Sequence, residues 1–361
     1  MSGSGSLEIT ATVVDRDVSV ELAVPAGQVV AVLGANGAGK STLLGLLAGQ
    51  LRPDHGRITV DGTVLVDTDH RTWVPAHRRR IGLLAQQALL FPHLTAAANV
   101  AFGPRSQGRG RTDARRVAEH WLTAVDAGQY ADRTPDQLSG GQAQRIAIAR
   151  ALAADPQVLL LDEPMAALDV AVAPAIRQLL RRVLAQTPRT TLLVTHDLID
   201  ALTLADRTVV VEAGRIVEDG PTRSVLAAPR SAFTARIAGV NLVAGTWTGQ
   251  HLITGGGVAV HGTADPACRP GDAAVAVFSP VAVAVYEDDP GGSPRNHLPA
   301  VVTELEPRGE TVRVHTAPFP GTSGLLADIT VAAAADLHLQ PGDRVRIAFK
   351  ATAVTVHPAA R

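Results

Sequence analysis

The sequence predicts an α/β fold for the first half of the chain and an all-β fold for the rest. In the first half, short runs rich in valine and leucine alternate with helical patterns, which is typical of a largely parallel sheet covered by helices. After about Ser231 the pattern changes to alternating valine and alanine with glycine and proline turns. We therefore expect three domains, at residues 1–231, 232–290 and 291–361, with a helical subdomain at about 90–150 inside the first.

Size and charge exclude some classes of protein. The 361 residues are too many for one typical domain, and a net charge of −1 gives no basic field that would attract nucleic acid. The single cysteine, Cys268, excludes an internal disulfide framework and suits a reducing compartment. No signal peptide is expected, and the longest nearly uncharged apolar stretch, Ala273–Tyr286, is too short for a transmembrane helix. Any role at a membrane would therefore depend on a partner.

Strands of two kinds are expected in the first half. Two antiparallel pairs flank the sheet: Leu7–Val13 with Val18–Val24, joined by a polar turn, and Arg57–Val60 with Thr63–Val66, joined by Asp-Gly, a strong hairpin signal. Buried strands are expected at Gln28–Leu33, Val158–Leu161, Thr191–Thr195 and Thr208–Val211.

A glycine-rich segment follows the first buried strand and opens a helical pattern, which is the context of a phosphate-binding loop. Its glycines would let backbone N–H groups wrap the β- and γ-phosphates of ATP, and the helix N-terminus would add a favourable dipole. Lys40 would neutralise the phosphates, Ser41 would ligate Mg²⁺, and Thr42 would contact the α-phosphate. The expected nucleotide-binding residues here are Gly34, Asn36, Gly37, Gly39, Lys40, Ser41 and Thr42.

The strand Val158–Leu161 ends in two carboxylates. Asp162 would complete the Mg²⁺ shell and Glu163 would polarise the attacking water, the two tasks that phosphoryl transfer requires. By itself, an apolar run that ends in acidic residues is commonly a strand meeting a solvated turn. The phosphate-binding loop upstream favours the catalytic interpretation.

A second anion-binding pattern, Ser139-Gly140-Gly141-Gln142 after Leu138, opens another helical run. It resembles the signature motif of the ABC ATPase family. In that family the signature of one subunit closes on the ATP held by the other, so the resemblance implies a homodimer with two composite sites.

The order of further motifs also resembles this family, over roughly residues 7–230. Gln86 resembles the Q-loop glutamine, which senses Mg²⁺ and the nucleophile. Asp169, in Ala167-Leu168-Asp169, resembles the D-loop, and His196 resembles the switch histidine that contacts the γ-phosphate. The resemblance thus implies Glu163, His196 and Gln86 as catalytic residues, with Ser41, Gln86 and Asp162 around Mg²⁺.

Two arginine-containing segments are less specific. Many family members stack an aromatic residue on adenine, but residues 11–24 contain none, and Arg16 is the nearby candidate for a stacking contact. Exposure of Arg16 to solvent is the simpler interpretation. The basic run at 77–80 is likewise expected to form a solvated face.

The C-terminal half contains an internal repeat. Pro270–Val285 aligns without gaps on Pro341–Val356, with seven of sixteen positions identical, including Phe278 and Phe349. Two small related β-barrels of oligosaccharide-fold type are expected, joined by a linker at Asp288–Pro294. The alternative is two hairpins that merely share a common turn.

Residues 90–103 resemble the ATPases of binding-protein-dependent importers, which carry sulfate, molybdate, iron, polyamines or sugars. In these ATPases the segment faces a membrane permease. The resemblance implies a separate permease, an extracytoplasmic substrate-binding protein, and a peripheral location at the cytoplasmic face of the membrane.

The last domain resembles the TOBE, or Mop-like, molybdate-binding fold. Ser293, Arg295, Asn296 and Lys350 match its motifs and could surround a tetrahedral oxyanion such as molybdate or tungstate. The chain departs from the usual motifs at Pro294 and Thr352. Barrels that only brace the dimer are the alternative role, and sulfate or thiosulfate is the nearest rival substrate.

Other classes fit the sequence less well. A soluble ABC ATPase that acts on nucleic acid typically has two cassettes or a long coiled coil, whereas this chain has one phosphate-binding loop and one signature. An oxyanion-sensing regulator would leave an intact Glu163 unexplained.

Overall fold

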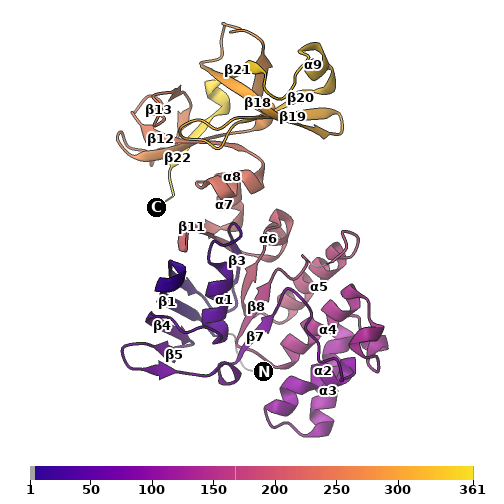
Figure 1. The fold of residues 1–361 in the computed structure, drawn as a ribbon. Helices are drawn as coiled ribbons and strands as arrows, with labels where there is room; N and C mark the ends of the chain where they lie inside the picture. Colours follow the sequence, from indigo (N-terminus) through magenta and orange to yellow (C-terminus); the bar gives the residue numbers. More distant parts are fainter. Residues whose placement is uncertain (1–4, 167, 361) are drawn as a thin grey trace. The chain divides into compact units, whose positions relative to one another are not determined.

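The computed structural model describes residues 5–166 and 168–360 (Figure 1). The described chain divides into two compact units, one that ends at Thr222 and one that begins at Arg223. The boundary predicted after residue 231 lies slightly further along, past α7 (Thr222–Ala227).

The central sheet of the first unit confirms the predicted α/β fold. Its strand order is β11-β10-β3-β9-β8-β7, with parallel pairing throughout except for β11 at one edge. All residues of β3 and β9 are buried, because a parallel sheet covered on both faces has no polar side. The strands are β3 (Val29–Leu33), β7 (Ile81–Leu84), β8 (Val158–Asp162), β9 (Thr190–Val194), β10 (Arg207–Glu212) and β11 (Arg215–Pro221).

An antiparallel sheet of order β2-β1-β4-β5-β6 packs its apolar face into the same core as α1. Both predicted pairs are confirmed. The second pair turns at Asp61 and Gly62, whose φ angles of 49° and 73° are the positive values that a two-residue hairpin turn needs. The strands are β1 (Leu7–Val13), β2 (Val18–Val24), β4 (His55–Val60), β5 (Thr63–Asp67) and β6 (Thr72–Trp73).

Helices occupy the stretch where a helical subdomain was predicted. Here α2, α3 and α4 share one apolar core, in which Val100, Leu122 and Ile146 are buried. The helices of the first unit are α1 (Lys40–Ala48), α2 (Ala96–Ser106), α3 (Arg111–Ala124), α4 (Gly140–Ala153), α5 (Ala173–Gln186) and α6 (Leu198–Leu204).

The prediction that residues 77–80 form a solvated face is wrong for Arg79, which is 1% exposed. Its Nη1 donates to the carbonyl oxygens of Leu46 at 2.7 Å and Leu47 at 3.0 Å, at the C-terminal end of α1. The guanidinium also lies 4.5 Å from the ring centre of Trp73. Burial lowers the pKa of Arg79 to about 10, so the group is still charged at neutral pH. Arg79 therefore caps a helix, where a positive charge is favoured.

Replacing Arg79 with methionine is expected to lower the free energy of unfolding by about 1–3 kcal/mol, because buried helix carbonyls lose their donor. Chemical denaturation of the full chain measures the change. Arg78→Met is the control, since Arg78 is exposed in the same short segment. An effect no larger than that of the control would show that the cap contributes nothing to stability.

In the second unit, the two sequence repeats have the same local structure of strand, 3₁₀ turn and strand. They exchange their second strands: β17 pairs with β21 of the other repeat, and β22 pairs with β16. The rings of Phe278 and Phe349 are stacked, with their centres 4.2 Å apart, in one core shared by both halves. The repeat therefore extends well beyond a common turn.

The two sheets of this unit have the orders β14-β13-β12-β16-β22-β15 and β17-β21-β18-β19-β20. The elements are α8 (Ala232–Ala238), β12 (Asn241–Trp247), β13 (Leu252–Ile253), β14 (Ala259–Val260), β15 (Thr263–Ala264), β16 (Ala273–Phe278), β17 (Val283–Tyr286), β18 (Asn296–Arg308), β19 (Thr311–Thr316), β20 (Leu326–Thr330), α9 (Val331–Asp336), β21 (Arg344–Phe349) and β22 (Thr355–Pro358).

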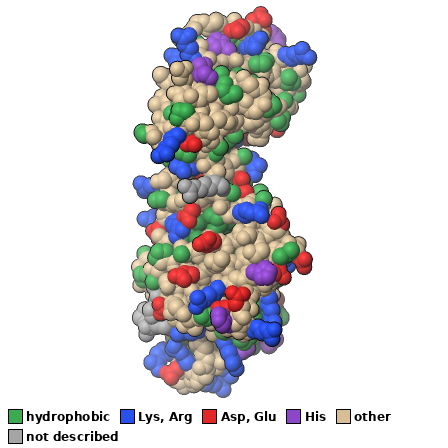
Figure 2. All heavy atoms as spheres, turned by 90° about the vertical axis from the view of Figure 1, so that its left-hand side faces the viewer, with side chains coloured by type: hydrophobic (Ala, Val, Ile, Leu, Met, Phe, Trp, Pro, Cys, Tyr) green, Lys and Arg blue, Asp and Glu red, His purple; other side chains and the backbone are tan. Residues whose placement is uncertain are grey.

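Two surface properties bear on function. Acidic and basic side chains both occur along the face shown in Figure 2, in keeping with the net charge of −1. Within residues 5–166 and 168–360, none of the helices has the length and apolarity needed to cross a membrane.

Candidate functional site

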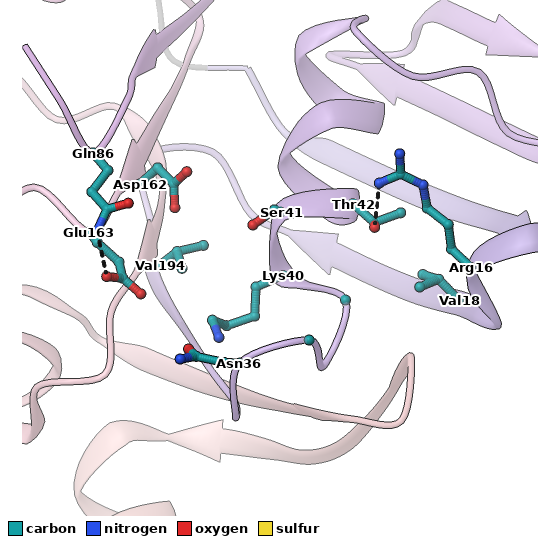
Figure 3. A pocket seen from close by; sticks show the side chains of 12 residues that line it. Arg16, Val18, Asn36, Lys40, Ser41, Thr42, Gln86, Asp162, Glu163 and Val194 are labelled. Atoms are coloured by element: carbon teal, nitrogen blue, oxygen red, sulfur yellow. Dashed lines mark hydrogen bonds between the residues drawn. The ribbon is translucent and has the colours of Figure 1, made fainter.

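A cavity of about 550 Å³ lies at the N-terminus of α1, and most of the predicted nucleotide-site residues line it (Figure 3). These predicted residues come from the loop after β3 and the start of α1, from the end of β8, and from the segment after β7, at the carboxyl edge of the parallel sheet. The lining residues are Arg16, Val18, Asn36, Gly37, Gly39, Lys40, Ser41, Thr42, Gln86, Asp162, Glu163 and Val194.

The loop between β3 and α1 has the tight shape that its glycines allow. A Cβ on Gly34 would lie 2.4 Å from the carbonyl oxygen of Val211, so no other residue fits there. Gly39 precedes α1 with a φ of 109°, and no side chain caps the helix. The first N–H groups of α1 are therefore free to bind an anion.

Lys40 lies across this loop, and its Nζ donates to the carbonyl oxygens of Gly34 at 2.8 Å and Ala35 at 2.9 Å. Burial lowers the pKa of Lys40, while the nearby charges of Glu163 and Asp162 oppose that shift. Burial and the charge of Glu163 raise the pKa of Asp162, and Lys40 lowers it. With Arg16, the described lining thus combines two cationic side chains with two carboxylates.

The oxygen groups of this cavity suit a small divalent cation. The Ser41 hydroxyl, the Asp162 carboxylate and the Gln86 amide all line it. Carboxylate, amide and hydroxyl oxygens are the ligands that Mg²⁺ prefers, with water and phosphate oxygens completing its shell. These residues fit the predicted Mg²⁺ site.

The three residues predicted to be catalytic meet at one carboxylate oxygen. Gln86 donates from Nε2 to Oε2 of Glu163 at 3.4 Å, and Nδ1 of His196 lies 3.4 Å from the same oxygen. Glu163 has a φ of 44°, an unusual value for a residue with a side chain, and its N–H donates to the carbonyl of Val194. Such local strain is typical of functional sites.

The signature and D-loop residues lie outside the described lining of this cavity. Ser139 caps α4: its hydroxyl accepts from the Gln142 N–H, and the Gln142 side chain accepts from the Ser139 N–H at 3.0 Å. A Cβ on Gly140 would meet nothing within 4 Å, whereas one on Gly141 would lie 2.7 Å from Val172. Asp169 lies before α5, and Ala167 of the D-loop is outside the described residues.

Three lining residues were not among the predicted site residues: Arg16, Val18 and Val194. Arg16 is exposed, as expected, but it also lines the cavity and donates to the Thr42 hydroxyl at 3.3 Å. Val18 and Val194 were interpreted only as strand residues, because an apolar residue at a strand end carries no signal that it faces a ligand.

In the second unit, the four predicted oxyanion residues differ in burial. Ser293, Arg295 and Lys350 are exposed. Asn296 is 1% exposed, and its amide pairs with the backbone of His261, accepting from the N–H at 2.7 Å and donating to the carbonyl at 3.0 Å. In this arrangement Asn296 joins two segments of the fold, and the oxyanion role of all four residues stays a prediction.

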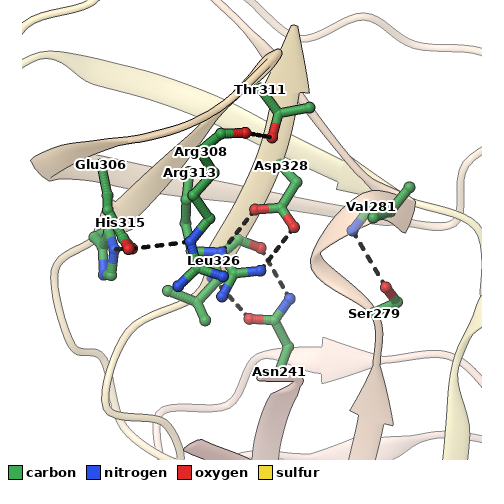
Figure 4. A network of polar contacts seen from close by, with 10 residues as sticks. All are labelled: Asn241, Ser279, Val281, Glu306, Arg308, Thr311, Arg313, His315, Leu326 and Asp328. Atoms are coloured by element: carbon green, nitrogen blue, oxygen red, sulfur yellow. Dashed lines mark hydrogen bonds and ion pairs between the residues drawn. The ribbon is translucent and has the colours of Figure 1, made fainter. Parts of the chain in front are cut away.

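Asn296 has a counterpart in the other half of the unit (Figure 4). Asn241 begins β12 opposite Phe278, as Asn296 begins β18 opposite Phe349, and the Asn241 amide pairs in the same way with the backbone of Leu326. Arg295 and Lys350 lie one residue beyond the Asn296–Phe349 pair. The corresponding positions in the other half are Val240 and Ser279, which carry no charge.

Close by, Arg313 pairs with both carboxylate oxygens of Asp328 at 2.7 Å across neighbouring strands (Figure 4). Both side chains are largely buried. This pair belongs to the fold of the unit, because its hydrogen bonds are satisfied without a ligand.

Comparisons with known families match both halves of the chain. A family model described as ABC transporter matches residues 18–166, and a model described as TOBE domain matches residues 292–356.

Several curated proteins are similar along nearly their whole length. The molybdenum import ATP-binding protein ModC of Mycobacterium tuberculosis is 53% identical over 98% of this chain and 97% of its own length. The Fe(3+) ions import ATP-binding protein FbpC 3 of Rhodococcus jostii is 38% identical over 93% of this chain and 92% of its own. The sulfate/thiosulfate import ATP-binding protein CysA of Mycobacterium bovis is 38% identical over 91% of this chain and 86% of its own length.

Among solved structures, the dimeric ATP-binding cassette MJ0796 bound to ADP and Pi is similar with a TM-score of 0.53 and 30% identity. It covers 60% of this chain and 99% of its own.

Proposed function

The chain belongs to the ABC transporter family of import ATP-binding proteins, and from this we propose that it hydrolyses ATP to drive the import of molybdate. The assignment of molybdate as the substrate is based on the similarity to the molybdenum import protein, which spans both units at 53% identity. The iron and sulfate import proteins, at 38%, support the same class of transporter with other substrates.

Nucleotide binding is assigned to the loop between β3 and α1. The unpaired N–H groups of α1 and the Lys40 ammonium would hold the β- and γ-phosphates, and Thr42 would reach the α-phosphate. Ser41, Asp162 and Gln86 would hold Mg²⁺, which neutralises the phosphate charge when bound. Arg16 lies at the rim of the same cavity, where its guanidinium could contact the base.

Hydrolysis is assigned to Glu163, with Gln86 and His196 in support. The Glu163 carboxylate would accept a hydrogen bond from the attacking water and draw its proton away. Both partners lie 3.4 Å from one of its oxygens, so they would hold the carboxylate in place. The His196 side chain is 63% exposed, so it would be accessible to the γ-phosphate.

We assign three partners on the same basis. A homodimer would bring Ser139, Gly140, Gly141 and Asp169 of one subunit to the ATP of the other, in keeping with their place outside the cavity. A membrane permease would contact residues 90–103, where Phe102 and the preceding Leu89 expose apolar side chains. An extracytoplasmic binding protein would deliver the substrate, so the ATPase would work at the cytoplasmic face of the membrane.

For the second unit we propose a regulatory oxyanion site formed by Ser293, Arg295, Asn296 and Lys350. The charges of Arg295 and Lys350, at one end of the β18–β21 pair, support it. A brace for the dimer is the second candidate role, favoured by the engaged amide of Asn296.

Uptake measurements test the substrate. Cells that lack this chain are expected to lose high-affinity uptake of radiolabelled molybdate and keep sulfate uptake, and wild-type chain but not the Glu163→Gln variant should restore it. Loss of sulfate uptake instead would assign the chain to a sulfate importer. Calorimetry of the full chain with molybdate, compared with Lys350→Ala, tests the oxyanion site, and an absence of heat would leave the second unit as a brace.

A further inference from the structure

A buried polar cluster beside the candidate site has no part in the function proposed so far. Arg177, on α5, donates from Nε to Oδ1 of Asp200 at 2.6 Å and from Nη2 to Oδ2 of Asp197 at 3.0 Å. Its side chain is 12% exposed, and that of Asp200 is 4% exposed. One planar guanidinium therefore joins two carboxylates at the start of α6, a geometry that the single ammonium of a lysine cannot reproduce.

The two carboxylates in turn fix the backbone on both sides of His196. Thr195 donates from its hydroxyl to Oδ2 of Asp200 at 3.0 Å and accepts from the Asp197 N–H at 3.0 Å. Asp197 also caps α6, accepting from the Ile199 N–H at 2.7 Å. Since Thr195 and Asp197 flank His196, the cluster sets where the imidazole stands relative to Glu163.

Burying the charges of this cluster costs free energy that a purely structural role does not require. Burial raises the pKa of Asp200, and the hydrogen bonds from Arg177 and Thr195 oppose that shift. A buried ion pair is often no more stabilising than apolar side chains of the same volume. A role in positioning His196 explains why charged groups occupy the site.

At its N-terminal end, about one turn before Arg177, α5 is tied to the segments that we propose face the partner subunit. The N–H groups of Val172 and Ala173 donate to the carbonyl of Asp169 at 2.8 and 3.1 Å. The Val172 side chain also packs against Gly141, where a Cβ would be 2.7 Å away. A shift of Asp169 or Gly141 would therefore be carried by α5 to Arg177.

We propose that Arg177 is a positioning residue that links the Asp169 and Gly141 segments to His196, so that closure of the partner subunit on ATP aligns the hydrolytic site. The inference rests on the proposed ATPase function. It assigns to Arg177 an effect on turnover rather than on nucleotide binding, because Arg177 is not among the described residues that line the cavity.

The test compares full-length variants by steady-state hydrolysis, by ATP affinity and by thermal unfolding. Arg177→Met is expected to reduce kcat on the order of tenfold to a hundredfold, because displaced catalytic groups cost that much. Its ATP affinity should stay within about twofold, since the phosphate loop is intact. Arg181→Met, exposed one turn further along α5, should behave as wild type, and Arg177→Lys should recover only part of the rate.

Loss of Arg177 also leaves Asp200 unpaired, so stability must be separated from positioning. The double variant Arg177→Met with Asp200→Asn removes both charges and keeps an oxygen for Thr195. We expect its melting temperature to recover while kcat stays low. If kcat recovers together with stability, or if Arg177→Met turns over like wild type while Glu163→Gln does not, the inference is wrong and the proposed function stands. A wild-type chain without ATPase activity would overturn both.

Discussion

Replacing Glu163 with glutamine is expected to reduce ATP hydrolysis at least on the order of a hundredfold, the usual contribution of a general base. Glutamine keeps the shape of the side chain and a hydrogen-bond partner for Gln86, but it cannot take the proton of the attacking water. ATP binding should change little, because Lys40, the proposed phosphate contact, and Asp162, the proposed Mg²⁺ ligand, are both kept. The variant should therefore accumulate in its ATP-bound form.

Two measurements on the purified full chain check this result. Phosphate release gives the rate, and size-exclusion chromatography with ATP and Mg²⁺ shows whether a stable dimer forms. Glu21→Gln, on the exposed face of β2, is the control for loss of a glutamate charge. Wild-type turnover by Glu163→Gln would mean that another group activates the water.

The parts of this molecule that can be predicted well from the sequence are those whose structure is set by residues close together in the chain. The loop from Gly34 to Thr42 is continuous in the chain, and Gly34, Gly37 and Gly39 all have positive φ angles, a local backbone requirement that glycine meets. The buried strands were found within one or two residues, because a strand enclosed on both faces is a continuous apolar run. The shared catalytic role of Gln86, Glu163 and His196 was implied by the family resemblance. Their spacing along the chain does not by itself show that they lie close together.

What the sequence does not reveal depends on distant partners. Arg79 was expected in water because the pattern shows its charge but not the carbonyl groups at the end of α1 that bind it. The exchange of β17 and β22 is hidden for a similar reason. The two repeats have nearly the same alternation, so either strand fits either sheet, and only the whole packing selects one pairing.

Replacing Lys40 with alanine is expected to weaken ATP binding on the order of 10- to 100-fold, the range for loss of a charged hydrogen bond. The effect extends beyond the lost contact. The charge of Lys40 lowers the pKa of Asp162, against burial and Glu163. Without Lys40 that pKa rises, so Asp162 is more often protonated as pH falls and binds Mg²⁺ less well.

The pH dependence separates this mechanism from general damage to the fold. A fluorescent ATP analogue should bind Lys40→Ala more weakly at every pH, and the deficit relative to wild type should widen as pH falls towards the raised pKa of Asp162. Lys350, the other lysine of the chain, is exposed and lies in the second unit, so Lys350→Ala should bind the analogue as wild type does. An unchanged affinity in Lys40→Ala would show that the helix N-terminus holds the phosphates without the ammonium. A deficit that is constant with pH would show that Lys40 acts on the phosphates alone and that Asp162 stays ionised without it.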